Sequence, residues 1–299
     1  MNRSLISYCC ALALISWLFP GNLPAPTPPD DLDHATDGIY ADLVTQLINE
    51  GYNSDYVRYL YNSGDDVFYY RLTKINLVQR EREDHYRRMF NNEAKRSIRE
   101  FIKTHKTQFD EVEEKYGVDR EVIASILYVE SRFGQVAGVN PVLYVLSSMT
   151  LAPADWNIEQ LVEELDELFP DITDGEREDK ISWLKSRARR KANWAYSELK
   201  TLLDLQKTHQ IDVKNLRGSW AGAFGMPQFM PTSFEAYAVD GDENGKIDLY
   251  TTADAIASVA NYLYRNGWRG TVTEQKKRKT VWRYNHSNYY VDLIMDLAD

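Results

Sequence analysis

Apolar side chains recur every three or four residues along most of this chain, the spacing that places them on one face of an α-helix. The first such face comprises Ile39, Leu43, Leu47 and Ile48. The sequence Gly-Tyr-Asn-Ser at residues 51–54 then predicts a turn that ends this helix. Residues 77–115 are mostly polar with sparse apolar positions, which is typical of amphipathic helices at a surface. Strand signals are few, so the pattern predicts a mainly α-helical protein.

The N-terminal segment has a different pattern. Arg3 precedes a largely apolar run from Leu5 to Phe19, which is typical of a secretory signal. No charge occurs over residues 4–29, which also suits a short membrane anchor. We expect a signal peptide or N-terminal membrane anchor at residues 1–25 (the anchor acting through residues 4–20), a Pro-rich linker at 26–36, and one domain at 37–299.

Composition narrows the class of function. The 299 residues carry 35 Lys and Arg against 45 Asp and Glu, so the formal net charge is −10. Domains that bind nucleic acid are usually basic, so the acidic balance argues against nucleic acid as a partner. Both cysteines, Cys9 and Cys10, lie in the N-terminal apolar run, and residues 37–299 therefore contain no disulfide or thiolate site.

Charged residues are also clustered along the chain. Residues 155–179 are rich in Asp and Glu, and the basic run 185–191 follows them. We interpret this insertion, about residues 150–191, as solvated helical faces that partly neutralise each other, or alternatively as a docking site for a partner. A second basic run at residues 276–279 is expected to be a solvated loop in an acidic, exported chain.

A carboxylate occupies an apolar position of one predicted helix. Ile123, Ile126 and Leu127 stand at i, i+3 and i+4. The next position of that face, i+7, is Glu130, and Gly134 is expected to end the helix. Burial disfavours the ionised form of a carboxyl and raises its pKa, as a general acid working near neutral pH requires. A structural Glu in a buried salt bridge is the other interpretation, and the pattern alone leaves both open.

Residues 216–234 combine small and aromatic side chains. Small residues between positions 218 and 225 permit close backbone approach, while Trp220, Phe224 and Phe229 supply flat apolar surface, as a sugar-binding loop requires. The segment matches neither the nucleophile motif of serine hydrolases nor a dinucleotide fingerprint. The five histidines are scattered without a His-Glu-x-x-His pair, which argues against a catalytic zinc site.

The segment from residue 240 to residue 251 fits the start of an EF-hand loop. Asp240, Asp242 and Asn244 fall at loop positions 1, 3 and 5, and the Lys246 carbonyl falls at position 7. Position 12 lacks the usual Glu, and Asp254 is the candidate that closes the shell. Oxygen ligands in such a loop suit a hard cation such as Ca²⁺, and a chance acidic turn is the alternative.

These stretches together resemble the lytic murein transglycosylase B family. The resemblance rests on Glu-Ser-Arg-Phe-Gly at 130–134, Gly-Ser-Trp-Ala-Gly-Ala at 218–223, Pro-Gln-Phe-Met-Pro-Thr-Ser-Phe at 227–234, the acidic loop, and Tyr-Asn-His-Ser-Asn-Tyr-Tyr at 284–290. It implies a lysozyme-like helical transglycosylase domain with an embedded EF-hand-like loop, at residues 240–254, and few short strands. Motif order and spacing make the resemblance specific.

The resemblance also implies roles for individual residues. Glu130 is similar to the family's single catalytic acid and base. The implied substrate-binding residues are Ser219, Gln228, Tyr262 and Asn285. The implied metal ligands are Asp240, Asp242, Asn244, Lys246 and Asp254, with Asp248 acting only through water. The implied metal is a structural Ca²⁺, and no catalytic cofactor is expected.

The implied activity is non-hydrolytic cleavage of the β-1,4 bond between N-acetylmuramic acid and N-acetylglucosamine, which leaves 1,6-anhydro ends. Peptidoglycan glycan strands would be the substrate, cell-wall synthesis or regulatory proteins would be further partners, and the periplasm or cell envelope would be the location. A hydrolytic muramidase, or a non-catalytic glycan-binding or scaffold protein of the same fold, are the alternatives.

Overall fold

The computed structural model describes residues 38–61, 67–79, 83–209 and 211–299. The expected signal peptide or anchor and the Pro-rich linker lie outside these residues. None of the helices in the described ranges has both the length and the apolar composition that crossing a membrane requires.

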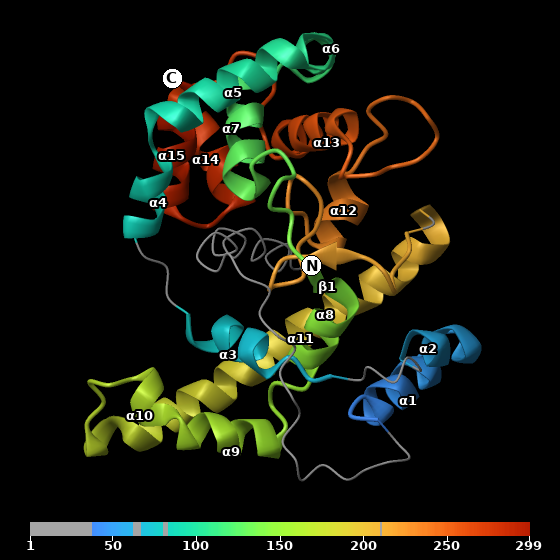
Figure 1. Cartoon of the computed structure of the whole chain (residues 1–299), viewed down its shortest axis with the longest axis vertical. Coiled ribbons are helices and arrows are strands. Elements are labelled where there is room, and N and C mark those ends of the chain that lie inside the picture. The colour runs from blue at the N-terminus through green and yellow to red at the C-terminus, as the bar shows by residue number, and fades with distance from the viewer. Residues whose placement is uncertain (1–37, 62–66, 80–82, 210) are drawn as a thin grey trace.

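Helices form almost all of the regular structure (Figure 1). In chain order, they are α1 (Ala41–Asn49), α2 (Ser54–Tyr61), α3 (Tyr70–Val78), α4 (Glu83–Met89), α5 (Asn92–Thr104), α6 (Lys106–Tyr116), α7 (Arg120–Ser131), α8 (Val142–Thr150), α9 (Asp155–Glu163), α10 (Leu165–Leu168), the 3₁₀ turn η2 (Asp174–Glu176), α11 (Arg177–His209), α12 (Pro231–Tyr237), α13 (Thr252–Arg265), α14 (Glu274–Tyr284) and α15 (Asn288–Ala298). The hydrophobic periodicity of the sequence predicted this mainly α architecture.

Helix α7 is the central element of one half of the molecule. It contacts α5, α13 and α15, and Figure 1 shows it among them. Every residue from Val122 to Ser131 is buried, so the helix has no solvent-facing side over its last ten residues. A helix enclosed in this way can hold a side chain out of water on any of its faces.

Helix α11 is the central element of the other half of the molecule. It runs for 33 residues and packs along α8 and α12. Its N-terminal part, with α9 and α10, lies in the segment of about residues 150–191 that the sequence suggests is an insertion, and that assignment stays a prediction. Glu164 of this segment pairs with Lys74 at 2.7 Å, and Asp166 pairs with Arg177 at 2.5 Å. These two acids are therefore neutralised by residues outside the basic run 185–191.

The second basic run was wrongly predicted as a loop. Residues 276–279 lie in α14, whose N-cap Thr273 accepts a hydrogen bond from the backbone N–H of Lys276. Val281 and Tyr284 bury one face of this helix. Lys277 forms an ion pair with Asp119 at the start of α7. Packing and a local cap thus decide the structure here, whereas charge alone suggested a loop.

One short antiparallel pairing joins the segment between α7 and α8 to the segment between α11 and α12. Strand β1 (Asn140–Pro141) pairs with β2 (Arg217–Gly218). The backbones approach so closely that a Cβ added to Gly138 would lie 2.1 Å from the carbonyl of Gly218. Gly138 also has φ +95°, a conformation that glycine adopts without strain.

Gly138→Ala should therefore destabilise the fold strongly, and Gly51→Ala provides a matched control. Gly51 has φ +96°, but an added Cβ would meet nothing within 4 Å. The control should lower the free energy of unfolding only through backbone strain, by about 1–2 kcal/mol. Gly138→Ala adds a backbone clash to the same strain and should lower it further. Urea denaturation of both variants measures the difference, and equal losses would contradict the close approach.

Candidate active site

Glu130 lies one residue before the end of α7. The structure confirms the burial that the i+7 position predicted, because its side chain has 0% exposure. The helix ends at Ser131 and not at Gly134, since Arg132, Phe133 and Gly134 follow with φ of 49°, 58° and 86°. The chain therefore turns sharply away immediately after the carboxylate.

One oxygen of the Glu130 carboxyl accepts a hydrogen bond, and the other forms none with the described residues. The hydroxyl of Tyr290, on α15, donates a hydrogen bond of 2.8 Å to Oε1. Oε2 is buried and has no hydrogen-bond partner among the described residues. Burial raises the pKa of Glu130 to about 8, although the Tyr290 hydrogen bond acts in the opposite direction. No charged side chain in the described part of the chain contributes to this shift, which disfavours the salt-bridge interpretation.

Ser219 and Gln228 lie in the loop after β2. The hydroxyl oxygen of Ser219 accepts hydrogen bonds from the N–H groups of Ala221 (3.3 Å) and Ala223 (3.1 Å). Its proton is donated to no residue in the described ranges and can therefore serve a ligand. The amide of Gln228 donates to the carbonyls of Ala137 (3.0 Å) and Gly225 (2.8 Å), so its NH₂ group holds the backbone in place.

Tyr262 and Asn285 lie beside the same loop. The ring of Tyr262 meets that of Tyr284 edge-on at 4.8 Å, and its hydroxyl donates to the carbonyl of Arg283 at 2.6 Å. Asn285 is fully buried and caps the C-terminus of α14. The ring of Tyr284 lies parallel to that of Tyr290, with centroids 6.4 Å apart. These aromatic contacts bring α13, α14 and α15 together next to Glu130.

Sequence reasoning did not assign roles to three residues that shape this site. Tyr290 contacts Glu130 directly, Tyr284 donates a hydrogen bond of 2.5 Å to the carbonyl of Pro227, and Ser131 donates one of 2.7 Å to the carbonyl of Met226. Both tyrosines belong to the 284–290 motif, so the motif located them without revealing their partners.

Three of the predicted metal ligands lie together. Asp240, Asp242 and Asp254 each offer a carboxylate oxygen, and these oxygens lie within 4.8 Å of one another. Asp254 is fully buried and accepts hydrogen bonds from the N–H groups of Gly241 (2.7 Å) and Asp248 (2.6 Å). Burial raises the pKa of Asp254, and the neighbouring Asp242 and Asp240 add to the rise. Three hard oxygen ligands that disfavour each other's charge fit a divalent cation.

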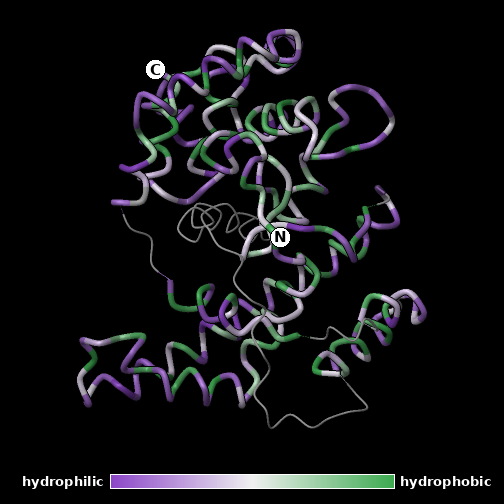
Figure 2. Tube along the Cα trace, in the orientation of Figure 1, coloured by the Kyte–Doolittle hydropathy of each residue, from purple (hydrophilic) through white to green (hydrophobic). Residues whose placement is uncertain are grey.

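The remaining metal-ligand predictions are not decided by this geometry. The side-chain oxygen of Asn244 accepts a hydrogen bond of 2.9 Å from the N–H of Lys246. Asp248 accepts one of 2.9 Å from the N–H of Tyr250. The segment between α12 and α13 is hydrophilic along most of its length, as Figure 2 shows. Asn244 and the Lys246 carbonyl stay predicted ligands.

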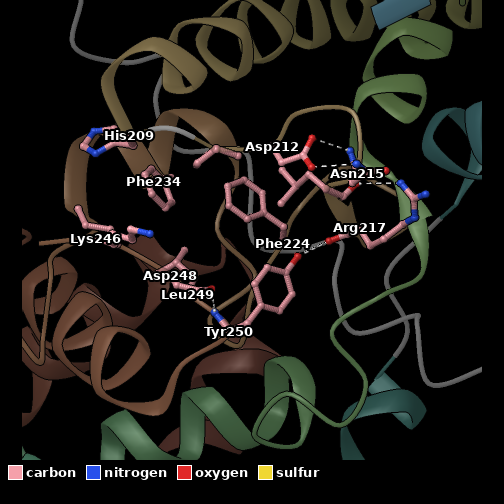
Figure 3. A pocket seen from close by; sticks show the side chains of 13 residues that line it. His209, Asp212, Asn215, Arg217, Phe224, Phe234, Lys246, Asp248, Leu249 and Tyr250 are labelled. Carbon is pink, nitrogen blue, oxygen red and sulfur yellow. Dashed lines mark hydrogen bonds between the residues drawn. The ribbon is translucent and has the colours of Figure 1, made fainter. Parts of the chain in front are cut away.

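A pocket of about 440 Å³ opens where this acidic loop meets the loop after β2 (Figure 3). Phe224, Phe234 and Leu249 are buried and form its apolar lining. The hydroxyl of Tyr250 points toward the carbonyl of Arg217 and donates a hydrogen bond to it. The acidic loop and the loop that carries Ser219 and Gln228 are thus in direct contact.

Comparison with known proteins identifies the family. The model of the transglycosylase SLT domain matches residues 38–279, which is more than half of the chain. The chain belongs to the SLT transglycosylase domain family. This confirms the resemblance that the motifs indicated.

Individual proteins of similar sequence or structure support this assignment. Membrane-bound lytic murein transglycosylase B of Escherichia coli is 35% identical over 153 residues, which cover 51% of this chain and 33% of that protein. The match thus spans about a third of the relative's length. Structures of E. coli SLT35, solved with bulgecin A and with calcium, both have a TM-score of 0.68 at 20% and 21% identity, covering 89% of this chain and 96% of theirs. The structure of SltB1 of Pseudomonas aeruginosa has a TM-score of 0.66 at 23% identity. The match covers 86% of this chain and 96% of the SltB1 chain. The lysozyme-like helical fold is confirmed.

Glu130→Gln should change how stability depends on pH. An ordinary Glu ionises near 4.5, whereas Glu130 stays protonated in the folded state up to about 8. The unfolded state therefore binds fewer protons in this window, and the wild type loses stability as pH rises through it, by about 1.4 kcal/mol per pH unit. Glu130→Gln removes this loss, and urea denaturation at about pH 5 and about pH 8 measures it.

Glu121→Gln is the matched control, because Glu121 is exposed on the first turn of the same helix. It should leave the pH dependence of the wild type unchanged. Parallel pH profiles for the wild type and Glu130→Gln would contradict the raised pKa.

Proposed function

We propose that this protein is a lytic transglycosylase that cleaves the β-1,4 bond between N-acetylmuramic acid and N-acetylglucosamine in peptidoglycan. The observation that carries the proposal is the fully buried carboxyl of Glu130, whose pKa is raised to about 8 by burial. Glycosidases that use water need a second carboxylate to activate it or to attack the sugar. No charged neighbour perturbs Glu130 in the described part of the chain, and this supports a reaction that needs one carboxyl only.

Glu130 would act first as an acid and then as a base. Protonated Glu130 donates its proton to the glycosidic oxygen, and the bond from that oxygen to C1 of N-acetylmuramic acid breaks. The acetamido group of the same sugar stabilises the positive charge that develops. Ionised Glu130 then takes the proton of the C6 hydroxyl as that oxygen bonds to C1, which gives the 1,6-anhydro product without water. Oε2 forms no hydrogen bond with the described residues, so it is the oxygen available for both proton transfers.

The loop after β2 would bind the sugar. The hydroxyl of Ser219 keeps its proton for a substrate acceptor, and this supports a direct hydrogen bond to the glycan. The NH₂ group of Gln228 and the hydroxyl of Tyr262 are occupied by backbone carbonyls. We therefore assign Gln228 and Tyr262 mainly to shaping the sugar-binding loop, with contacts to substrate through their remaining polar atoms and ring faces. A contact of Asn285 with substrate stays a prediction from the resemblance.

The acidic loop would hold a structural Ca²⁺. Asp240, Asp242 and Asp254 supply the carboxylates, and Asn244 and the Lys246 carbonyl complete the set of oxygen ligands. The solved calcium complex of SLT35 supports this choice of metal. The metal would stabilise the fold and supply no step of the reaction.

The proposed site of action is the cell envelope, where peptidoglycan lies. The names of the relatives, membrane-bound in one case and soluble in another, support an envelope location without fixing attachment. Export or anchoring through residues 4–20, and association with cell-wall synthesis or regulatory proteins, stay predictions from the sequence.

Mass spectrometry of products tests the activity. The wild type, incubated with purified peptidoglycan, should release anhydro-muropeptides, and Glu130→Gln should release none because the variant cannot donate the proton. Glu121→Gln should retain wild-type turnover. Products heavier by one water would identify a hydrolytic muramidase, and binding without cleavage by the wild type would identify a glycan-binding protein.

Thermal denaturation tests the metal. Calcium should raise the melting temperature of the wild type, and Asp240→Ala should abolish this rise because it removes a ligand. Glu243→Gln removes a charge from an exposed side chain of the same loop that is not among the clustered carboxylates, so it should keep the rise. An equal loss for Asp240→Ala in calcium and in chelator would argue against metal binding.

A further inference from the structure

The segment Gly225–Phe229 is fixed by contacts from several parts of the chain. The carbonyl of Met226 accepts from Ser131, and the carbonyl of Pro227 accepts from Tyr284. The N–H of Met226 donates to the carbonyl of Leu249 at 2.8 Å. Because buried backbone groups must be paired, each of these bonds holds the segment at a defined place.

Ser131 holds this segment against the end of α7. Its hydroxyl is fully buried, donates to the carbonyl of Met226 at 2.7 Å, and accepts from the N–H of Gly134 at 2.9 Å. The second bond fixes the left-handed turn that follows the helix. The hydroxyl also lies 3.4 Å from the carbonyl of Leu127, in the preceding turn of the helix. Because Ser131 is the immediate neighbour of Glu130, its bonds to Met226 and Gly134 hold the end of α7, and with it the carboxyl, against the loop that carries Gln228.

Leu249 holds the same segment against the acidic loop. Its carbonyl accepts from Met226, and its side chain packs so closely that a Cβ added to Gly225 would lie 2.4 Å from the Cβ of Leu249. The preceding residue, Asp248, has its N–H bonded to the carboxylate of Asp254. Figure 3 shows Leu249 and Tyr250 on the side of the pocket that faces Phe224. The acidic loop is therefore linked to Met226 by a hydrogen bond and to the neighbouring Gly225 by close packing.

We propose that Ser131 is a positioning residue that couples the acidic metal-binding loop to Glu130 through Met226. This inference rests on the proposed function for its catalytic consequence, and on the geometry alone for the coupling between Ser131 and the loop. Met226 uses its N–H for the acidic loop and its carbonyl for Ser131. A displacement of Leu249 must therefore either move Met226 and Ser131 or break one of two buried hydrogen bonds.

Such coupling is reciprocal, because two events linked through one structural element influence each other by the same factor. If an ordered metal loop favours the position of Ser131, then removal of the Ser131 hydroxyl must weaken metal binding. This consequence can be measured without any substrate.

The test compares Ser131→Ala with Ser125→Ala in the full chain. Ser125 is also fully buried on α7, but its hydroxyl has no hydrogen-bond partner among the described residues. Both variants remove one buried oxygen, and only the first breaks the bond to Met226. Calorimetric titration with Ca²⁺ should show about fivefold weaker binding for Ser131→Ala and wild-type binding for Ser125→Ala. Ser131→Cys keeps the shape of the side chain, although sulfur is larger than oxygen, and keeps a weak donor, so it should give a smaller loss in the same direction.

Kinetics with peptidoglycan fragments give the second measurement. Ser131→Ala should lower kcat with little change in KM, because the variant misplaces the acid without removing a contact to substrate. Equal calcium affinities for Ser131→Ala and Ser125→Ala would overturn the proposed coupling. A wild type that cleaves no glycan would instead overturn the proposed function, and the calcium titration would still decide the coupling.

Discussion

The withdrawal of one carboxyl from water is the constraint on which the rest of the structure depends. Glu130 is placed where burial opposes its ionised form, and no cation in the described part of the chain compensates for it. Desolvation can be this complete only because α7 is enclosed over its last ten residues. The helices α5, α13 and α15 that contact it therefore do two things at once: they build the core, and they keep an acid protonated near neutral pH.

A buried carboxyl also needs a fixed orientation, and aromatic packing supplies it. Tyr290 contributes its hydroxyl to Glu130, while its ring lies parallel to that of Tyr284, which in turn contacts Tyr262. The hydroxyls of Tyr284 and Tyr262 are bonded to backbone carbonyls and not to the acid. One hydrogen bond thus orients Glu130 and lowers its pKa only in part, whereas several would favour the ionised form and remove its ability to donate a proton.

The sequence predicted what depends on local periodicity and on motif spacing. The position of Glu130 at i+7 of an apolar face is a property of eight consecutive residues, and the structure confirms that Glu130 is buried. The end of the same helix was misplaced by three residues, because Gly134 is the residue type that usually ends a helix. The actual end is set by Ser131, whose hydroxyl pairs with Gly134 and with the distant Met226. The partner of Glu130, Tyr290, lies 160 residues away, a distance over which single-sequence periodicity carries no information.

The basic run in α14 shows the same limit from another direction. Residues 276–279 contain only charged side chains, so composition suggested a loop, but α14 forms because Val281 and Tyr284 are buried on its inner face. Lys277 then extends from that helix to Asp119, at the residue that precedes α7. This partly exposed ion pair contributes little stability, about 0–1 kcal/mol, yet it joins the first turn of α7 to the helix that carries Tyr284. Both ends of α7 are thereby connected to α14, the start through Lys277 and the end through Tyr284, Pro227 and the Met226 bond to Ser131. Placement of the acid is therefore a property of this closed set of contacts, which no single stretch of the sequence contains.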